Sequence, residues 1–89
     1  MFTTYVIKND IDEIYIGQTD DLFLRLKRHN GELPTKNTSY THKHKNGEWN
    51  IVLTEEFETR RDAMKREKQL KSSRGRVYIR EIITRQKLK

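Results

Sequence analysis

Residues 2–19 place the strongest constraint on the fold, because they contain two strand patterns on either side of one turn. The run FTTYVIK is rich in β-branched and aromatic residues, and a second such run extends from Glu13 to about Thr19. The tetrapeptide Asn9-Asp10-Ile11-Asp12 between them has the composition of a turn. The chain is therefore predicted to begin with an antiparallel hairpin.

Tyr5 and Tyr15 can become neighbours in this hairpin only under one condition. Side chains alternate between the two faces of a sheet, and the two residue numbers have an even sum. The turn must then contain an odd number of residues, or the strands must contain a bulge. Each tyrosine alone is also compatible with a core aromatic residue. Gly17 leaves room for a close approach by a substrate or by the following helix.

The rest of the chain predicts three helices and one more strand. A helix over residues 21–29 has Thr19 or Asp20 as its N-cap and ends at Asn30-Gly31. The polar residues 31–47 form a long loop, which is a candidate substrate-contacting segment. A strand follows over residues 49–57, and the predicted order of elements is ββαβαα.

The two C-terminal helices have their own sequence signals. Thr59 and Asp62 have the spacing of a capping box before the helix TRRDAMKREKQLKSS. The last helix is predicted over residues 75–86. Its inward stripe is predicted to consist of Val77, Ile79, Ile82 and Ile83.

The length of the chain, 89 residues, allows one small hydrophobic core, so residues 1–89 are predicted to form a single domain. The chain has no cysteine, which excludes disulfides and thiolate metal ligands and favours a cytoplasmic setting. It also lacks a signal-peptide pattern and an apolar run long enough to span a bilayer. We therefore expect a soluble protein with no membrane partner.

Positive charge is concentrated in the C-terminal third. Residues 1–59 contain 7 Lys/Arg and 10 Asp/Glu, a net charge of −3, whereas residues 60–89 contain 12 and 3, a net charge of +9. Such a concentration favours a polyanionic partner, with nucleic acid as the leading class. The alternative is that these side chains only keep the helices soluble.

The helix over residues 21–29 carries a polar pair beside its apolar stripe. Leu22 and Leu26 are one turn apart and are expected to face the core, which places Arg25 and His29 at the edge of that core. An arginine held there suits bidentate contact with a phosphate. The alternatives are an ordinary surface arginine and a histidine that only complements the helix C-terminus.

A carboxylate interrupts the apolar stripe of the next helix. Ala63, Glu67 and Leu70 lie on one face, and an ionised carboxylate at such a position requires a cation, a metal ion or several donors. The alternative is that Glu67 turns back to solvent beside Arg66 or Lys71. His42 and His44 could bind a metal ion, but two histidines in a loop are more often ordinary polar surface residues, and we favour that interpretation.

These motifs together resemble the GIY-YIG nuclease family, in particular its small stand-alone bacterial members, over nearly the full chain. The second motif is present as Tyr15-Ile16-Gly17, TDDLFLRLKRHN resembles the helix with Arg, Leu and His, and DAMKREKQLK resembles the helix with the metal-binding glutamate. SYTHK and EWNIVLTEEF resemble the loop and third strand of the small members. The first motif departs from the pattern, because Thr3-Thr4-Tyr5 replaces Gly-Ile-Tyr.

The resemblance implies an α+β fold with a small three-stranded antiparallel sheet flanked by helices. It also implies a metal-dependent endonuclease that hydrolyses phosphodiester bonds, with DNA as the expected substrate. In this reading Glu67 holds one Mg²⁺ or Mn²⁺ ion, and Tyr5 accepts a proton from the attacking water, directly or with Tyr15. Nearby cations are expected to lower the pKa of Tyr5. Arg25 stabilises charge on the phosphate, and His29 orients a tyrosine or relays the proton.

Other basic residues are expected to contact the nucleic-acid backbone without reading bases. This set consists of Arg60, Arg61, Lys65, Lys68, Arg74, Arg76 and Arg80. Two rival readings remain open: a nucleic-acid-binding module of the same fold with weak or no turnover, and a protein-interaction or structural domain.

Overall fold

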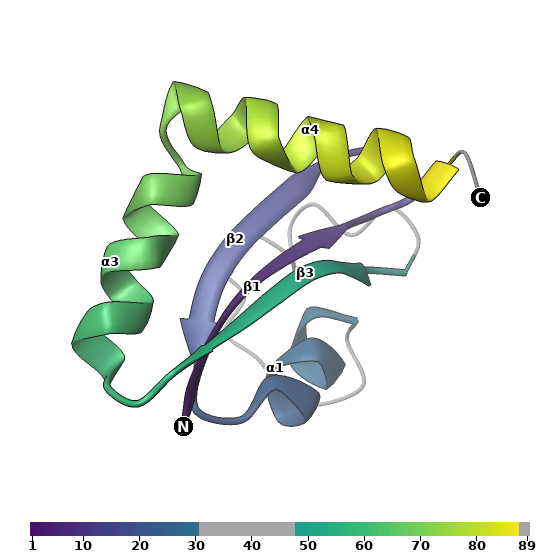
Figure 1. Cartoon of the computed structure of the whole chain (residues 1–89). Coiled ribbons are helices and arrows are strands. Elements are labelled where there is room, and N and C mark those ends of the chain that lie inside the picture. Colours follow the sequence, from purple (N-terminus) through teal and green to yellow (C-terminus); the bar gives the residue numbers. More distant parts are fainter. Residues whose placement is uncertain (31–47, 88–89) are drawn as a thin grey trace.

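The computed structural model describes residues 1–30 and 48–87. Its elements are β1 (Phe2–Lys8), β2 (Ile14–Thr19), α1 (Leu22–His29), β3 (Asn50–Phe57), α3 (Arg60–Leu70) and α4 (Ser73–Lys87) (Figure 1). This order confirms the predicted ββαβαα arrangement of an α+β fold. The predicted loop over residues 31–47, with His42 and His44, lies outside the described residues. None of the described helices has the length and apolar character needed to cross a membrane.

The three strands form one antiparallel sheet in the order β2-β1-β3. Tyr5 pairs with Gly17, and Ile7 pairs with Tyr15. The connecting residues 9–13 are odd in number, so Tyr5 and Tyr15 lie on the same face of the sheet. The condition derived from the sequence is therefore met by the length of the turn.

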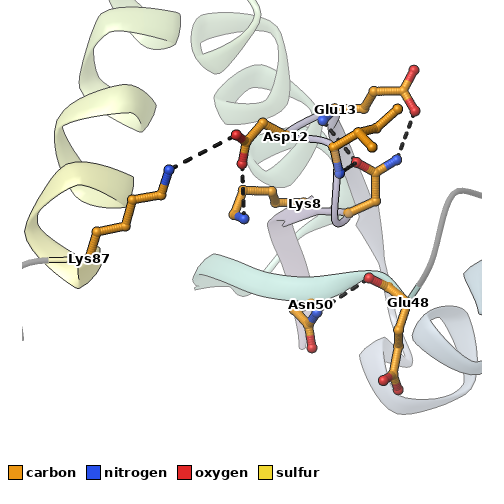
Figure 2. A network of polar contacts seen from close by, with 8 residues as sticks. Lys8, Asp12, Glu13, Glu48, Asn50 and Lys87 are labelled. Atoms are coloured by element: carbon orange, nitrogen blue, oxygen red, sulfur yellow. Dashed lines mark hydrogen bonds and ion pairs between the residues drawn. The ribbon is translucent and has the colours of Figure 1, made fainter.

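The β1–β2 turn is held by one buried side chain. The Asn9 Oδ1 atom accepts hydrogen bonds from the backbone N–H groups of Ile11 (3.1 Å) and Glu13 (2.9 Å). Asp12 has a φ of 63°, a left-handed conformation that aspartate tolerates better than most residues. The Lys87 Nζ atom lies 4.0 Å from an Asp12 carboxylate oxygen (Figure 2), but this exposed pair contributes little to stability.

Hydrophobic side chains pack on both faces of the sheet. The cluster on the α3 and α4 side consists of Val6, Ile16, Val52, Leu70 and Ile79. The cluster on the α1 side consists of Tyr5, Ile7 and Trp49, with Tyr15, Leu22 and Leu26 packed against it. The sheet is therefore the central layer, and both predicted catalytic tyrosines lie on its α1 side.

The helix N-caps are partly as predicted. Asp21, and not Thr19 or Asp20, caps α1, because its Oδ1 atom accepts from the Leu24 N–H at 3.1 Å. The Thr19 hydroxyl instead accepts from the Asp21 N–H at 3.1 Å, one step before the helix. Thr59 caps α3 as predicted, with its hydroxyl accepting from the backbone N–H of Asp62.

The final helix differs from the prediction at its start and on one face. α4 begins at Ser73, so Gly75 lies in its first turn instead of starting the helix. Val77 is 51% exposed and not part of the inward stripe, because it lies two residues from the buried Ile79 and therefore on the opposite side of the helix. Ile82 and Ile83 pack against the core as predicted.

Gly75→Ala is expected to destabilise the protein. A Cβ atom at this buried position would collide with the backbone of Gln69 and Leu70 at the end of α3. We expect the free energy of unfolding to fall by about 1–3 kcal/mol, the range found for overpacking, although Gly→Ala usually stabilises a helix. Urea unfolding followed by Trp49 fluorescence measures the change.

The matched control is Arg74→Ala, at the exposed neighbouring position. This variant is expected to stay within about 0.5 kcal/mol of the parent protein. A stability gain in Gly75→Ala would show that the α3–α4 junction has room for a methyl group.

Candidate active site

The hydroxyl group of Tyr5 is the meeting point of side chains from β1 and α1. Tyr5 is 1% exposed, and its Oη atom lies 2.8 Å from His29 Nε2 and accepts a hydrogen bond from Arg25 Nε at 3.4 Å. Leu22 and Leu26 pack against the Tyr5 cluster, which directs the adjacent Arg25 and His29 stripe of α1 toward the same tyrosine. The polar pair predicted at the edge of the core therefore converges on one phenol.

Tyr15 completes an aromatic group with Tyr5 and His29. Its ring centroid lies 4.8 Å from that of His29 and 6.2 Å from that of Tyr5, both in tilted arrangements. Hydrogen bonds from Arg25 to the side chains of Tyr5 and Tyr15 raise the pKa of Arg25. Arg25 is therefore held between two phenols that come from adjacent strands.

Gly17 sets the spacing of the two tyrosines. A Cβ atom on Gly17 would lie 2.8 Å from the Tyr5 Oη atom and 3.0 Å from the Tyr15 Cε1 atom. The close approach predicted at this glycine is therefore made by the two tyrosine rings, and neither a substrate nor the first helix is needed to explain it.

His29 is a buried residue of the site and not an exposed C-terminal charge of α1. It is 4% exposed, and burial, followed by the positive charge of Arg25, lowers its pKa to about 4. The imidazole is therefore neutral near pH 7, and a neutral Nε2 atom can accept the Tyr5 proton.

Two opposing effects set the pKa of Tyr5. Burial raises it to about 12, although the hydrogen bond from Arg25 acts to lower it. Arg25 lowers the pKa of Tyr5 as predicted, but the loss of hydration around the buried phenol is the larger effect, so the net shift is upward. Tyr5 is therefore a neutral phenol near pH 7.

Glu67 lies on α3 beside Lys71. Ala63 and Leu70 are buried as predicted, whereas the Glu67 side chain is 25% exposed and its Oε2 atom accepts from Lys71 Nζ at 3.0 Å. The contact with Lys71 matches part of the alternative, in which Glu67 turns back to solvent beside Arg66 or Lys71, but the side chain stays largely covered. The negative charge of Glu67 also contributes to the raised pKa of Tyr5. The carboxylate therefore interacts electrostatically with the group formed by Tyr5, Tyr15 and His29, which we call the tyrosine group.

Two clefts border the tyrosine group. One, of about 410 Å³, is lined by Tyr15 together with Lys71, Arg76 and Arg80, and we call it the β2–α4 cleft. The other, of about 260 Å³, is lined by Arg25, Arg28 and Arg60. Lys71 and Arg28 were missed by the sequence analysis. Helical spacing could have predicted both, because Lys71 follows Glu67 by one turn and Arg28 follows Arg25 by one turn, so each lies on the same face as a predicted site residue.

The predicted backbone-binding residues fall into two groups. Arg60, Arg76 and Arg80 line these two clefts. The remaining four are exposed and line neither cleft: Arg61, Lys65, Lys68 and Arg74.

The His29 environment predicts a pH-dependent stability. Because the folded pKa of about 4 lies below the ordinary value of 6.5, the unfolded state binds more protons between these values. Stability should therefore fall as the pH falls from 6.5 to 4, by at most about 1.4 kcal/mol per pH unit. Urea unfolding of the parent protein and His29→Gln across this range isolates the effect, since the other groups are common to both. Parallel pH curves would contradict a neutral, buried His29.

Comparison with known proteins places this geometry in a family. The model of the GIY-YIG catalytic domain matches residues 1–80, which include every side chain of the tyrosine group, Glu67 and both clefts. The chain belongs to the GIY-YIG family. A solved structure, the solution NMR structure of the UPF0213 protein BH0048 from Bacillus halodurans, superimposes with a TM-score of 0.52 and 25% identity. The alignment covers 92% of this chain and 85% of that one. No curated protein matches the chain.

The altered first motif of this GIY-YIG domain has a structural explanation at one position. Thr4 is buried, and its hydroxyl donates a hydrogen bond of 2.7 Å to the backbone carbonyl of Ala63. This contact joins β1 to the first turn of α3, the helix that carries Glu67. Thr4 therefore helps to hold Glu67 and Tyr5 in fixed relative positions.

Proposed function

We propose that this protein is a divalent-cation-dependent endonuclease that hydrolyses phosphodiester bonds in DNA. The observation that carries the proposal is the convergence of Arg25, His29 and Tyr15 around the Tyr5 hydroxyl. A structural domain has no need to hold a buried, neutral histidine and a half-buried arginine against one phenol. Membership of a nuclease family and the arginine-containing clefts beside Tyr15 and beside Arg25 support the same conclusion.

The proposed reaction is an attack by water on phosphorus. The water oxygen forms a bond to phosphorus, the bond from phosphorus to the 3′ oxygen breaks, and the products carry a 3′ hydroxyl and a 5′ phosphate. Tyr15 is half-buried and lines the β2–α4 cleft, whereas Tyr5 is fully buried, so Tyr15 is the tyrosine that we assign to contact with the water. The proton of the water passes to the buried Tyr5 by way of the Tyr15 hydroxyl. Tyr5 in turn passes its own hydroxyl proton to His29 Nε2, which lies 2.8 Å away.

This relay suits the protonation states of the two groups. Tyr5, with a pKa of about 12, is a poor source of free phenolate near pH 7. A phenol that gains one proton as it releases another stays neutral throughout, and the neutral imidazole of His29 is available to receive the released proton. The Arg25 guanidinium lies beside the Tyr5 hydroxyl, and its proposed role is to stabilise the charge that develops on the phosphate.

The residues present fit a hard divalent cation. Among residues 1–30 and 48–87, no group of three His, Cys, Asp or Glu side chains could form a complete metal site. A single carboxylate is nevertheless a usual protein contribution for Mg²⁺, whose other ligands are water and substrate phosphate oxygens. Glu67 would hold the ion, and Lys71 would give up its contact with the carboxylate. When bound, a Mg²⁺ or Mn²⁺ ion supplies positive charge that polarises the phosphate.

Glu67→Gln is the direct test of the proposed metal dependence. We expect the parent protein to nick plasmid DNA and cleave branched oligonucleotides in Mg²⁺ or Mn²⁺, and to lose this activity in EDTA. Glu67→Gln should lose the metal-dependent rate, whereas Glu81→Gln, which changes an exposed carboxylate of α4, should retain it.

Tyr15→Phe and Tyr5→Phe should each lower the cleavage rate under the same conditions, because each removes a hydroxyl from the proton path. Full activity in Glu67→Gln and in both phenylalanine variants would reject this site. Salt-dependent DNA binding without any cleavage would support the alternative of a binding module without turnover, which the Glu67–Lys71 ion pair also fits.

A further inference from the structure

The C-terminal end of α3 carries a lysine that is paired with the proposed metal ligand. The Lys71 Nζ atom lies 3.0 Å from Glu67 Oε2, and the two residues are one helical turn apart. The Lys71 side chain is 50% exposed and that of Glu67 is 25% exposed, so the lysine is the more accessible member of the pair. A divalent cation therefore approaches a carboxylate that already has a positive partner.

No other cation takes this place in the described part of the chain. Arg66, the other basic neighbour of Glu67 in sequence, donates to both carboxylate oxygens of Glu55, at 2.8 and 3.2 Å, and to Gln69 at 3.3 Å. Within the same part of the chain, Lys71 alone forms an ion pair with Glu67, and its ammonium has no second acceptor. Because exposed pairs of this kind are weak, Lys71 can exchange Glu67 for another anion.

The charges at this pair favour one particular anion. A divalent cation on Glu67 and the Lys71 ammonium repel each other, and one carboxylate leaves two of their three positive charges uncompensated. A phosphodiester supplies a further negative charge and has oxygens for both the ion and the ammonium. Mg²⁺ in proteins usually takes one or two carboxylates and completes its ligands with water and substrate phosphates. A phosphate therefore relieves the repulsion that the ion creates.

The pair lies within electrostatic range of the tyrosine group. The negative charge of Glu67 contributes to the raised pKa of Tyr5, which shows that the carboxylate and the phenol interact. Lys71 follows the last residue of α3, at the corner where the chain turns into α4 (Figure 1). A phosphate that reaches an ion on Glu67 is thus also within reach of the flexible Lys71 side chain, which has three donors.

We propose that Lys71 is a substrate-binding residue that occupies Glu67 in the free protein and transfers to a substrate phosphate when a divalent cation binds this carboxylate. The proposal deepens the proposed function and rests on it for the identity of the substrate. Its consequence is that the cation and DNA bind cooperatively, since the cation releases Lys71 for the phosphate. By linkage, the cation must tighten DNA binding by the same factor by which DNA tightens cation binding.

The first test is the binding of Mn²⁺ without DNA, measured from the electron paramagnetic resonance signal of the free ion. Lys71→Met keeps a long side chain and removes its charge, so it should bind Mn²⁺ about three- to tenfold more tightly than the parent protein. Lys68→Met removes the same charge from an exposed position on α3 that does not contact Glu67, and it should bind Mn²⁺ as the parent does. Glu67→Gln identifies the ions that this carboxylate binds.

The second test is the affinity for a labelled oligonucleotide, measured by fluorescence anisotropy in Ca²⁺ and in EDTA at equal ionic strength. Gel electrophoresis verifies that the DNA stays intact. Ca²⁺ should tighten binding by the parent protein several-fold, and most of this gain should be lost in Lys71→Met. Lys68→Met should keep the gain, because a contact of Lys68 with the DNA backbone changes both affinities alike.

Equal Mn²⁺ affinities in Lys71→Met and Lys68→Met would overturn the proposal, and so would a Ca²⁺ effect on DNA binding that does not depend on Lys71. Neither measurement requires cleavage. A tighter Mn²⁺ site in Lys71→Met with no cleavage by the parent protein would reject the nuclease function and keep the exchange of Lys71. Cleavage that depends on Glu67, with equal Mn²⁺ affinities in the two lysine variants, would do the reverse.

Discussion

Arg25→Ala is expected to lower kcat for DNA cleavage by about 10²–10³-fold, the usual effect of removing one charge-stabilising donor from an active site. Arg25 is hydrogen-bonded to the hydroxyls of both tyrosines, and it lines the cleft that also contains Arg28 and Arg60. Its proposed contact strengthens as charge develops on the phosphate, so the loss should appear mainly in kcat and much less in KM. Steady-state cleavage of a labelled oligonucleotide in Mg²⁺ measures both constants.

Arg25→Lys distinguishes charge from geometry. Lysine retains the positive charge but lacks the planar fork that can bond two phenols and a phosphate at once, so we expect it to recover only a small part of the lost rate. Arg85→Ala removes an exposed arginine that lines neither cleft and is not among the predicted backbone-binding residues, and it should retain the parent kcat. A tenfold rise in KM with an unchanged kcat in Arg25→Ala would show that Arg25 serves only to bind DNA.

The sequence predicted the parts of this site that depend on local periodicity. The alternation of side chains in β1 and β2, together with the odd-length turn, placed Tyr5 and Tyr15 on one face. Helical spacing placed Arg25 and His29 beside the apolar stripe of α1. Both predictions depend on residues close in sequence, where the geometry of a strand or helix leaves few alternatives.

The features that the sequence did not reveal depend on contacts between distant elements. The burial of His29 requires the rings of Tyr5 and Tyr15 around it, and the raised pKa of Tyr5 depends on how completely those neighbours exclude water. Gly75 looked like a helix boundary because its tight contact with the end of α3 is a tertiary feature. The β2–α4 cleft likewise arises from the angle at which α4 crosses the sheet, which no local pattern encodes.

Gly17→Ala is expected to damage both stability and catalysis, because the new Cβ atom would lie 2.8 Å from Tyr5 Oη and 3.0 Å from Tyr15 Cε1. Both rings are tightly packed, so the tyrosine pair must separate to admit the methyl group. We expect the free energy of unfolding to fall by about 1–3 kcal/mol, as for other overpacked sites. Because small displacements of catalytic groups reduce rates strongly, kcat should fall by about 10²-fold. Thr54→Ala, an exposed change on β3, is the control for substitution in the sheet.

A double-mutant cycle with Tyr5→Phe tests whether this effect comes from the tyrosine pair. Tyr5→Phe removes the Oη atom, which is the nearest neighbour of the added Cβ atom, while the Tyr5 Cζ and Tyr15 Cε1 contacts at 3.0 Å remain. Gly17→Ala should therefore destabilise the Tyr5→Phe protein less than it destabilises the parent, with a coupling free energy above about 0.5 kcal/mol. Strictly additive effects would mean that the methyl group is accommodated without moving Tyr5. Gly17 would then have no part in spacing the two phenols, and the loss of activity in Gly17→Ala would need another cause.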